Sequence, residues 1–212
     1  RKVPMSEGVI TTDEYKRILQ SLRGAGWGGV DYTGGEPMLN SEWDTLVQAA
    51  RDMGYERAEV TTNGTLLNYY LDKKGRLPDG LTKFKVSIDT HDPDRFREIT
   101  RGGSLENIAK GIRRARETNP DLVLRANKVL LRSDMPSIPD YVDYVASLGM
   151  DGMIFLDLVL TEAQKAHERA FFEREYVFID EVVVELRRLY GDNLAIEDDR
   201  YCHVAVLPNG LF

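Results

Sequence analysis

Several short apolar segments of this chain are followed by glycine, acidic, amide and hydroxyl residues that could bind a small molecule. Gly34 and Gly35 stand together in the sequence Thr33-Gly34-Gly35-Glu36-Pro37. Paired glycines let a ligand approach the main chain closely. The adjacent carboxylate of Glu36 suits a cationic group such as an amine, because it accepts charge-assisted hydrogen bonds.

Other residues at corresponding positions extend this chemistry. Arg125 could complement a carboxylate, and the remaining polar side chains could bind hydroxyl groups. These are Asn63, Ser87, Asp89 and Asn127. Together they predict a pocket for an amino acid joined to a sugar.

The elements that must position these residues alternate along the chain. Apolar runs predict strands at Gly29–Thr33, Arg57–Thr62, Lys83–Asp89, Leu122–Leu131 and Gly152–Leu160, separated by stretches of helical periodicity. Such alternation requires parallel pairing and right-handed crossovers. Ligands of parallel α/β folds bind at the carboxyl ends of the strands, where the polar residues above are found.

Composition indicates an ordinary globular α/β protein. The 212 residues are 42% hydrophobic and 30% charged, and no apolar run is long enough to span a bilayer. A formal net charge of −7 argues against general nucleic-acid binding. Cys202 is the only cysteine, which fits a reducing compartment, so a cytoplasmic location is expected.

Four motifs carry a resemblance to a known family. TGGEP, TTNGTLL, VSID and RANKVLL, in this order and each at a strand end, resemble the barrel of the radical S-adenosylmethionine (SAM) superfamily. The likeness covers about Thr11 to Leu160 and is strongest to the branch with molybdenum-cofactor cyclases and peptide-modifying enzymes. It implies a partial TIM barrel of the (β/α)6 type over residues 1–190, with a C-terminal β-hairpin extension beginning over residues 191–212.

The resemblance also implies roles for individual residues. Gly34, Gly35 and Glu36, with Pro37 of the same motif, would hold the methionine amine of SAM. Ser87 and Arg125 would lie near its carboxylate, and Val159 beside its adenine. The residues near the ribose or the substrate would be Asn63, Asp89 and Asn127. Thr62 is a further candidate for binding the cofactor. Asp157, a carboxylate in a very apolar strand, is the catalytic candidate that would face the substrate.

The cofactors implied are SAM and a 4Fe-4S cluster that reduces it to a 5′-deoxyadenosyl radical, with flavodoxin or ferredoxin as reductant. The three clustered cysteines of the family are absent, and their loop is expected to precede Arg1. Cys202, ahead of Pro208-Asn209-Gly210, resembles a ligand of an auxiliary 4Fe-4S cluster.

Several alternatives stay open at this point. The substrate could be a peptide, a nucleoside or a sugar. The molybdenum-cofactor GTP cyclase fits less well, because Asp31 stands where those enzymes resemble one another in carrying an arginine. A barrel that binds SAM or a nucleotide without radical chemistry is a further alternative, and a phosphate-binding lyase or aldolase ranks last. Lys85 and Lys128 are expected to face solvent.

Overall fold

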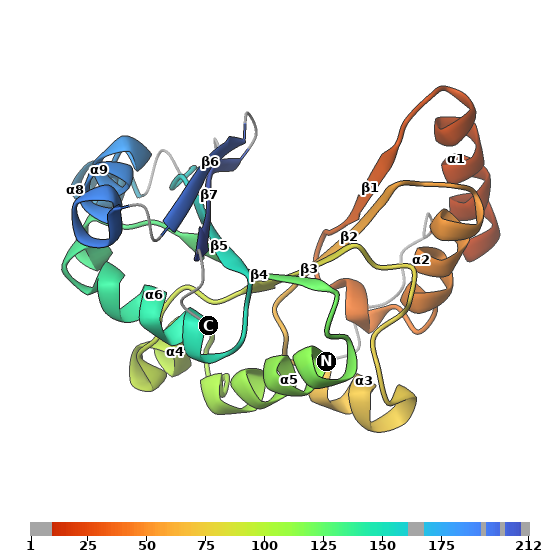
Figure 1. Cartoon of the computed structure of the whole chain (residues 1–212), viewed down its shortest axis with the longest axis horizontal. Coiled ribbons are helices and arrows are strands. Elements are labelled where there is room, and N and C mark those ends of the chain that lie inside the picture. Colours follow the sequence, from red (N-terminus) through yellow and green to blue (C-terminus); the bar gives the residue numbers. More distant parts are fainter. Residues whose placement is uncertain (1–9, 161–167, 192–193, 200–201, 209–212) are drawn as a thin grey trace.

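The fold is an open, curved sheet with helices along its outer face (Figure 1). It was obtained as a computed structural model, which describes residues 10–160, 168–191, 194–199 and 202–208. The strand order is β1-β2-β3-β4-β5-β7-β6. The strands are β1 (Gly29–Tyr32), β2 (Arg57–Thr62), β3 (Lys83–Ser87), β4 (Val123–Val129), β5 (Gly152–Leu156), β6 (Leu194–Asp199) and β7 (Cys202–Pro208).

Helices fill the connections between the strands. They are α1 (Thr12–Gly24), η1 (Pro37–Leu39), α2 (Trp43–Asp52), α3 (Leu67–Lys74), α4 (Pro93–Ile99), α5 (Leu105–Thr118), η2 (Arg132–Ser137), α6 (Ile138–Ser147), α8 (Arg169–Glu175) and α9 (Ile179–Tyr190). Side chains cap some of these helices. Thr11 and Glu14 form a capping box at α1, and Ser104 accepts a hydrogen bond from the amide of Asn107 at the start of α5.

The first five strands are parallel, so their carboxyl ends share one edge of the sheet. Alternate side chains of each strand point to opposite faces. One set packs against the helices and is fully buried; it includes Val60, Phe84, Val86, Leu124 and Ala126. The other set lies on the inner face of the arc, where polar and charged side chains predominate among the strand residues of β1 to β4.

This architecture confirms the predicted α/β partial barrel. Strands β1, β3, β4 and β5 end one, two, two and four residues earlier than predicted. The hairpin of β6 and β7 adds antiparallel to β5, and β6 was not predicted. The division into residues 1–190 and 191–212 stays a prediction. In the described part of the chain, no helix has the length and apolar character needed to cross a membrane.

Candidate functional site

The loop after β1 offers an open main chain beside a fixed carboxylate. Gly34 has φ +119°, a conformation that side chains disfavour, and a Cβ added at Gly34 or Gly35 would meet nothing within 4 Å. Glu36 begins η1, and its Oε1 accepts a hydrogen bond from the amide of Met38 at 3.1 Å. The two glycines therefore leave room for a ligand, while Glu36 orders the turn.

Glu36 also joins this loop to the end of β2. Its Oε1 accepts a hydrogen bond from the Thr62 hydroxyl at 2.6 Å, and its Oε2 accepts one from the amide of Asn63 at 2.8 Å. Three protein donors thus occupy the carboxylate. Since a carboxylate has about four acceptor positions, roughly one is left for a ligand amine.

The loop after β2 is ordered by its own side chains. Asn63 Oδ1 accepts from both the amide and the hydroxyl of Thr65, at 2.9 and 2.6 Å. Thr62 Oγ1 accepts the amide of Gly64 at 3.0 Å. Gly64 has φ +75°, and an added Cβ would lie 2.8 Å from Val86 and 3.2 Å from Ile108. Only glycine fits this tightly packed turn.

Ser87 and Asn127 are partners in the register of β3 and β4, so they lie side by side on the inner face. Asn127 is 9% exposed, and its Oδ1 accepts no hydrogen bond from any residue that the structure describes. A buried polar atom in this state usually has a water or a ligand as its partner. This acceptor therefore marks the inner face as a place where a donor group binds.

Asp89 lies just beyond β3 and acts on the neighbouring strand. Its Oδ1 accepts the amide of Val129 at 2.9 Å, which ties the end of β3 to the end of β4. The carboxylate is thus engaged with the main chain in this structure.

A cluster of charges covers the inner face closer to the amino ends of the strands. Lys85 Nζ lies 2.6 Å from Asp31 and 3.0 Å from Glu59, and Lys83 lies 3.1 Å from Glu59. Burial favours the neutral amine of Lys85, but the hydrogen bonds and charges of Asp31 and Glu59 outweigh this effect and raise its pKa. Burial likewise opposes ionisation of Glu59, yet Lys85 and then Lys83 lower its pKa. These four side chains pair with one another across the inner face.

The structure brings some predicted residues together and separates others. Glu36, Thr62 and Asn63 are bonded directly, and Pro37 lies in the same turn. Arg125 is paired in register with Lys85, two residues before Asn127 on the same face of β4. Asp157 follows β5 and is partly buried.

The end of the sheet beyond β5 is less compact. Val159 is 78% exposed and lines a hollow of about 490 Å³ with Leu158, Leu160, Arg169 and Phe172. Cys202 begins β7, and the antiparallel register of β7 with β5 brings this backbone position toward the carboxyl edge. The side chain of Cys202 and the turn at residues 209–210 lie outside the described residues.

Two lysines are buried, so the prediction that they face solvent is wrong. Lys85 and Lys128 are 8% and 2% exposed. Their partners include Asp31 and Glu59 for Lys85, and Asp134 for Lys128. The sequence did contain a signal for the pair of Lys85 and Glu59, because a lysine in one strand often pairs with a glutamate in the neighbouring strand. Asp134 could not be found in this way, because it lies in the short helix η2 and not in a neighbouring strand.

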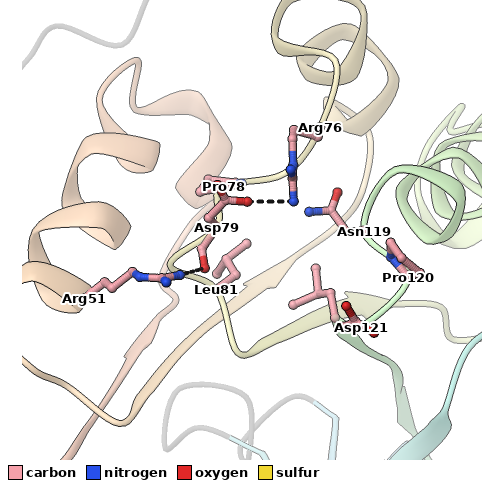
Figure 2. A pocket seen from close by; sticks show the side chains of 9 residues that line it. Arg51, Arg76, Pro78, Asp79, Leu81, Asn119, Pro120 and Asp121 are labelled. Atoms are coloured by element: carbon pink, nitrogen blue, oxygen red, sulfur yellow. Dashed lines mark hydrogen bonds and ion pairs between the residues drawn. The ribbon is translucent and has the colours of Figure 1, made fainter.

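A second hollow of about 340 Å³ lies at the opposite edge, before the amino ends of β3 and β4 (Figure 2). Three of its polar residues pair with one another: Arg76 lies 2.6 Å from Asp79, and Arg51 donates to the Asp79 carbonyl. Asn119 bonds to both the amide and the carbonyl of Leu77. These contacts join the loops around the hollow. The carboxyl edge of the sheet is therefore the better candidate site.

Metal binding by the described residues is not supported. Among side chains described by the structure, no group of three His, Cys, Asp or Glu residues could hold a metal ion. The sequence contains one cysteine, so it does not supply the three cysteines of a 4Fe-4S site. SAM fits better, because an open glycine turn and an unsatisfied buried acceptor lie on the same sheet edge.

Comparisons with known proteins identify relatives of the chain. The chain is 30% identical over 160 residues to a probable GTP 3′,8-cyclase of Methanococcus maripaludis (strain C7), covering 75% of this chain and 52% of that protein. It is 30% identical over 179 residues to the GTP 3′,8-cyclase of Stenotrophomonas maltophilia (strain R551-3), covering 84% and 52%. The chain thus spans about half the length of these relatives.

Solved structures show the same fold. TYW1 with a lysine-pyruvate adduct bound superposes with a TM-score of 0.65 at 19% identity, over 93% of this chain and 66% of that one. SuiB of Streptococcus suis bound to S-adenosylmethionine gives 0.60 at 19% identity, over 83% and 39%.

The sequence profile of the Radical SAM superfamily matches residues 3–153, which is most of the chain. Membership implies an enzyme that uses SAM and a 4Fe-4S cluster. From its motifs, its open parallel sheet and this match, we conclude that the chain belongs to the radical SAM superfamily.

Proposed function

We propose that this chain is the SAM-binding barrel of an enzyme that abstracts hydrogen from a peptide, nucleoside or sugar in a modification or biosynthetic pathway. The observation that carries the proposal is the buried Oδ1 of Asn127, which has no donor among the described residues and lies beside Ser87 on the inner face. A ribose hydroxyl would supply that donor. SAM, when bound and reduced by an iron-sulfur cluster, supplies a 5′-deoxyadenosyl radical.

The residues of this chain bind and orient. The main chain at Gly34 and Gly35 would receive the methionine amine, and the remaining acceptor position of Glu36 would bind it. Ser87 and Arg125 would face the methionine carboxylate. Asn63, Asp89 and Asn127 would serve the ribose or the substrate, with Thr62 and Pro37 fixing the loops. Val159 would lie beside the adenine, and Asp157 would face the substrate.

Cluster ligands are not part of this sequence, apart from Cys202 as a candidate for an auxiliary cluster. We place Cys202 in that role because β7 begins at this residue and runs antiparallel to β5. The start of β7 therefore lies toward the carboxyl edge of the sheet, where the candidate site is. A flavodoxin or a ferredoxin would supply the electron.

A second candidate function is cyclisation of GTP, which the names of the two curated relatives favour. The charges of the inner face favour a less anionic substrate. Asp31 and Glu59 neutralise Lys85, and Glu59 also pairs with Lys83, so these lysines are not available to a triphosphate. We therefore rank a substrate without a polyphosphate first.

The test uses the full-length protein, reconstituted anaerobically with iron and sulfide and supplied with dithionite and SAM. Formation of 5′-deoxyadenosine is the expected result. SAM binding without 5′-deoxyadenosine would instead support a SAM-binding barrel without radical chemistry. Adding GTP distinguishes the two candidate functions. A GTP cyclase would convert it, whereas an enzyme that acts on a substrate without a polyphosphate would leave GTP unchanged.

A further inference from the structure

A buried lysine lies directly behind the candidate site. Asn127 and Lys128 are consecutive in β4, so their side chains point to opposite faces of the sheet. Lys128 is 2% exposed, and its Nζ lies 2.7 Å from Asp134 Oδ2 and 5.3 Å from the centre of the Tyr141 ring of α6. It also donates to the main-chain carbonyl of Asp89.

The partners of Lys128 connect this point to the surrounding elements. Asp134, 4% exposed, accepts the amide of Leu131 at 3.2 Å and pairs with Arg95 of α4 at 3.1 Å. The buried charge therefore links β4 to η2 and α4, and the arrangement leaves neither ion without a partner.

The network acts on the two residues that follow β3. Lys128 donates to the carbonyl of Asp89, and the Tyr141 hydroxyl donates to the carbonyl of Ile88 at 2.8 Å. The amide of Ile88 donates to the Asn127 carbonyl at 2.9 Å. The main chain beside Ser87 and Asn127 is thus held from the helix side of the sheet.

Such an arrangement is costly in free energy. Burial lowers the pKa of Lys128, although the charge and hydrogen bond of Asp134 oppose this effect. Apolar residues of similar size often stabilise a core at least as well as a buried ion pair. The presence of the Lys128–Asp134 ion pair in the core is explained if it serves the neighbouring site.

We propose that Lys128 and Asp134 are positioning residues for the SAM site, which hold Ile88 and Asp89 so that Ser87 and Asn127 present their polar atoms to the cofactor. This inference rests on the proposed function. Neither residue reaches the inner face itself; both act through the main chain of β3 and β4.

The experiment measures the dissociation constant of SAM by calorimetry on the full-length protein, reconstituted anaerobically, together with the melting temperature. The main variant is Lys128→Met/Asp134→Leu, which removes both buried charges. Arg95, the other ionic partner of Asp134, has a side chain that is 38% exposed and can be solvated by water. We expect it to melt near the wild-type temperature but to bind SAM about tenfold more weakly. Lys128→Arg should bind within about threefold of wild type, because it keeps the ion pair with Asp134.

The matched control is Lys74→Met/Asp44→Asn, since this ion pair of 3.0 Å joins α3 to α2 away from β3 and β4. It should bind SAM as the wild type does. Wild-type affinity in the Lys128→Met/Asp134→Leu variant would overturn the inference and leave the proposed function intact. Absence of SAM binding by the wild type would overturn both. Should the double variant not fold, Lys128→Gln compared with Lys128→Arg decides: equal affinities would contradict the positioning role.

Discussion

The hydroxyl of Thr62 donates to Glu36 Oε1 at 2.6 Å, so the loop after β1 is fastened to the last residue of β2. Thr62 is 2% exposed, and its oxygen also accepts the amide of Gly64. The carboxylate of the glycine-rich motif is therefore part of the framework of the site. A substitution at Glu36 will change the shape of the loops as well as any contact with the ligand.

Replacing Glu36 by Gln tests this double role. The amide group of Gln would face one of three protein donors and leave it without an acceptor, which costs roughly 1–3 kcal/mol. We expect urea unfolding to show this loss and SAM affinity to fall about tenfold or more. The control is Glu42→Gln, where a glutamate accepts from Thr12 at the surface; there both quantities should change little, and similar losses in the two variants would contradict the prediction.

Gly64 and Gly75 form a natural pair for separating backbone strain from steric overlap. Both have positive φ, but an added Cβ meets Val86 and Ile108 at Gly64 and nothing within 4 Å at Gly75. Gly75→Ala should lower the free energy of unfolding by about 1 kcal/mol, from strain alone. Gly64→Ala should lower it by roughly 3 kcal/mol, because strain and overpacking add. Equal losses in chemical denaturation would show that the packing around Gly64 is loose.

Lys85→Met removes the cation that Asp31 and Glu59 share. Asp31, with a side chain that is 43% exposed, then loses its lysine partner, and Glu59 keeps only Lys83. We therefore expect a loss of about 1–3 kcal/mol in the free energy of unfolding. Adding Glu59→Gln should recover part of that loss, because a neutral amide then replaces the carboxylate of Glu59, whose side chain is 13% exposed. A double variant as unstable as the single one would mean that Lys85 acts through packing of its carbon chain.

The stability of the α8 region should depend on pH through Glu175. Hydrogen bonds from Arg174 and Ser133 lower the pKa of Glu175 to about 2, from an ordinary value of 4.5. Its contribution is therefore complete above about pH 4.5 and declines as the pH falls toward 2. Glu175→Gln should destabilise the protein clearly at pH 7 and much less at pH 3.

Urea unfolding at the two pH values measures this difference. Glu117→Gln, at an exposed position of α5, is the control and should have little effect at either pH. A destabilisation by Glu175→Gln that is equal at pH 7 and pH 3 would rule out the carboxylate charge as its cause.

Much of the fold could be predicted from local patterns. The strand Arg57–Thr62 is found as predicted, because the hydrophobic period is a local signal. The hairpin strand β6 was missed, since it carries the acidic run Glu197-Asp198-Asp199, which is unusual in strands.

The site was predictable in outline but not in its internal bonding. Strand order alone brings Glu36, Asn63, Ser87 and Asn127 to one edge, and this follows from parallel βα units. Which carboxylate binds its neighbours instead of a ligand depends on three-dimensional contacts. For this reason the sequence did not predict that Asp89 bonds to Val129, or that Lys128 is buried against Asp134.

Asn127 and Lys128 also restrict how β4 can change over evolution. Insertion or deletion of one residue within this strand would exchange their faces, placing an ammonium on the inner face and an amide among the helices. Length variation of a single residue should thus be rejected within β4. Divergence there is confined to substitutions, whereas loops far from the carboxyl edge remain free to grow.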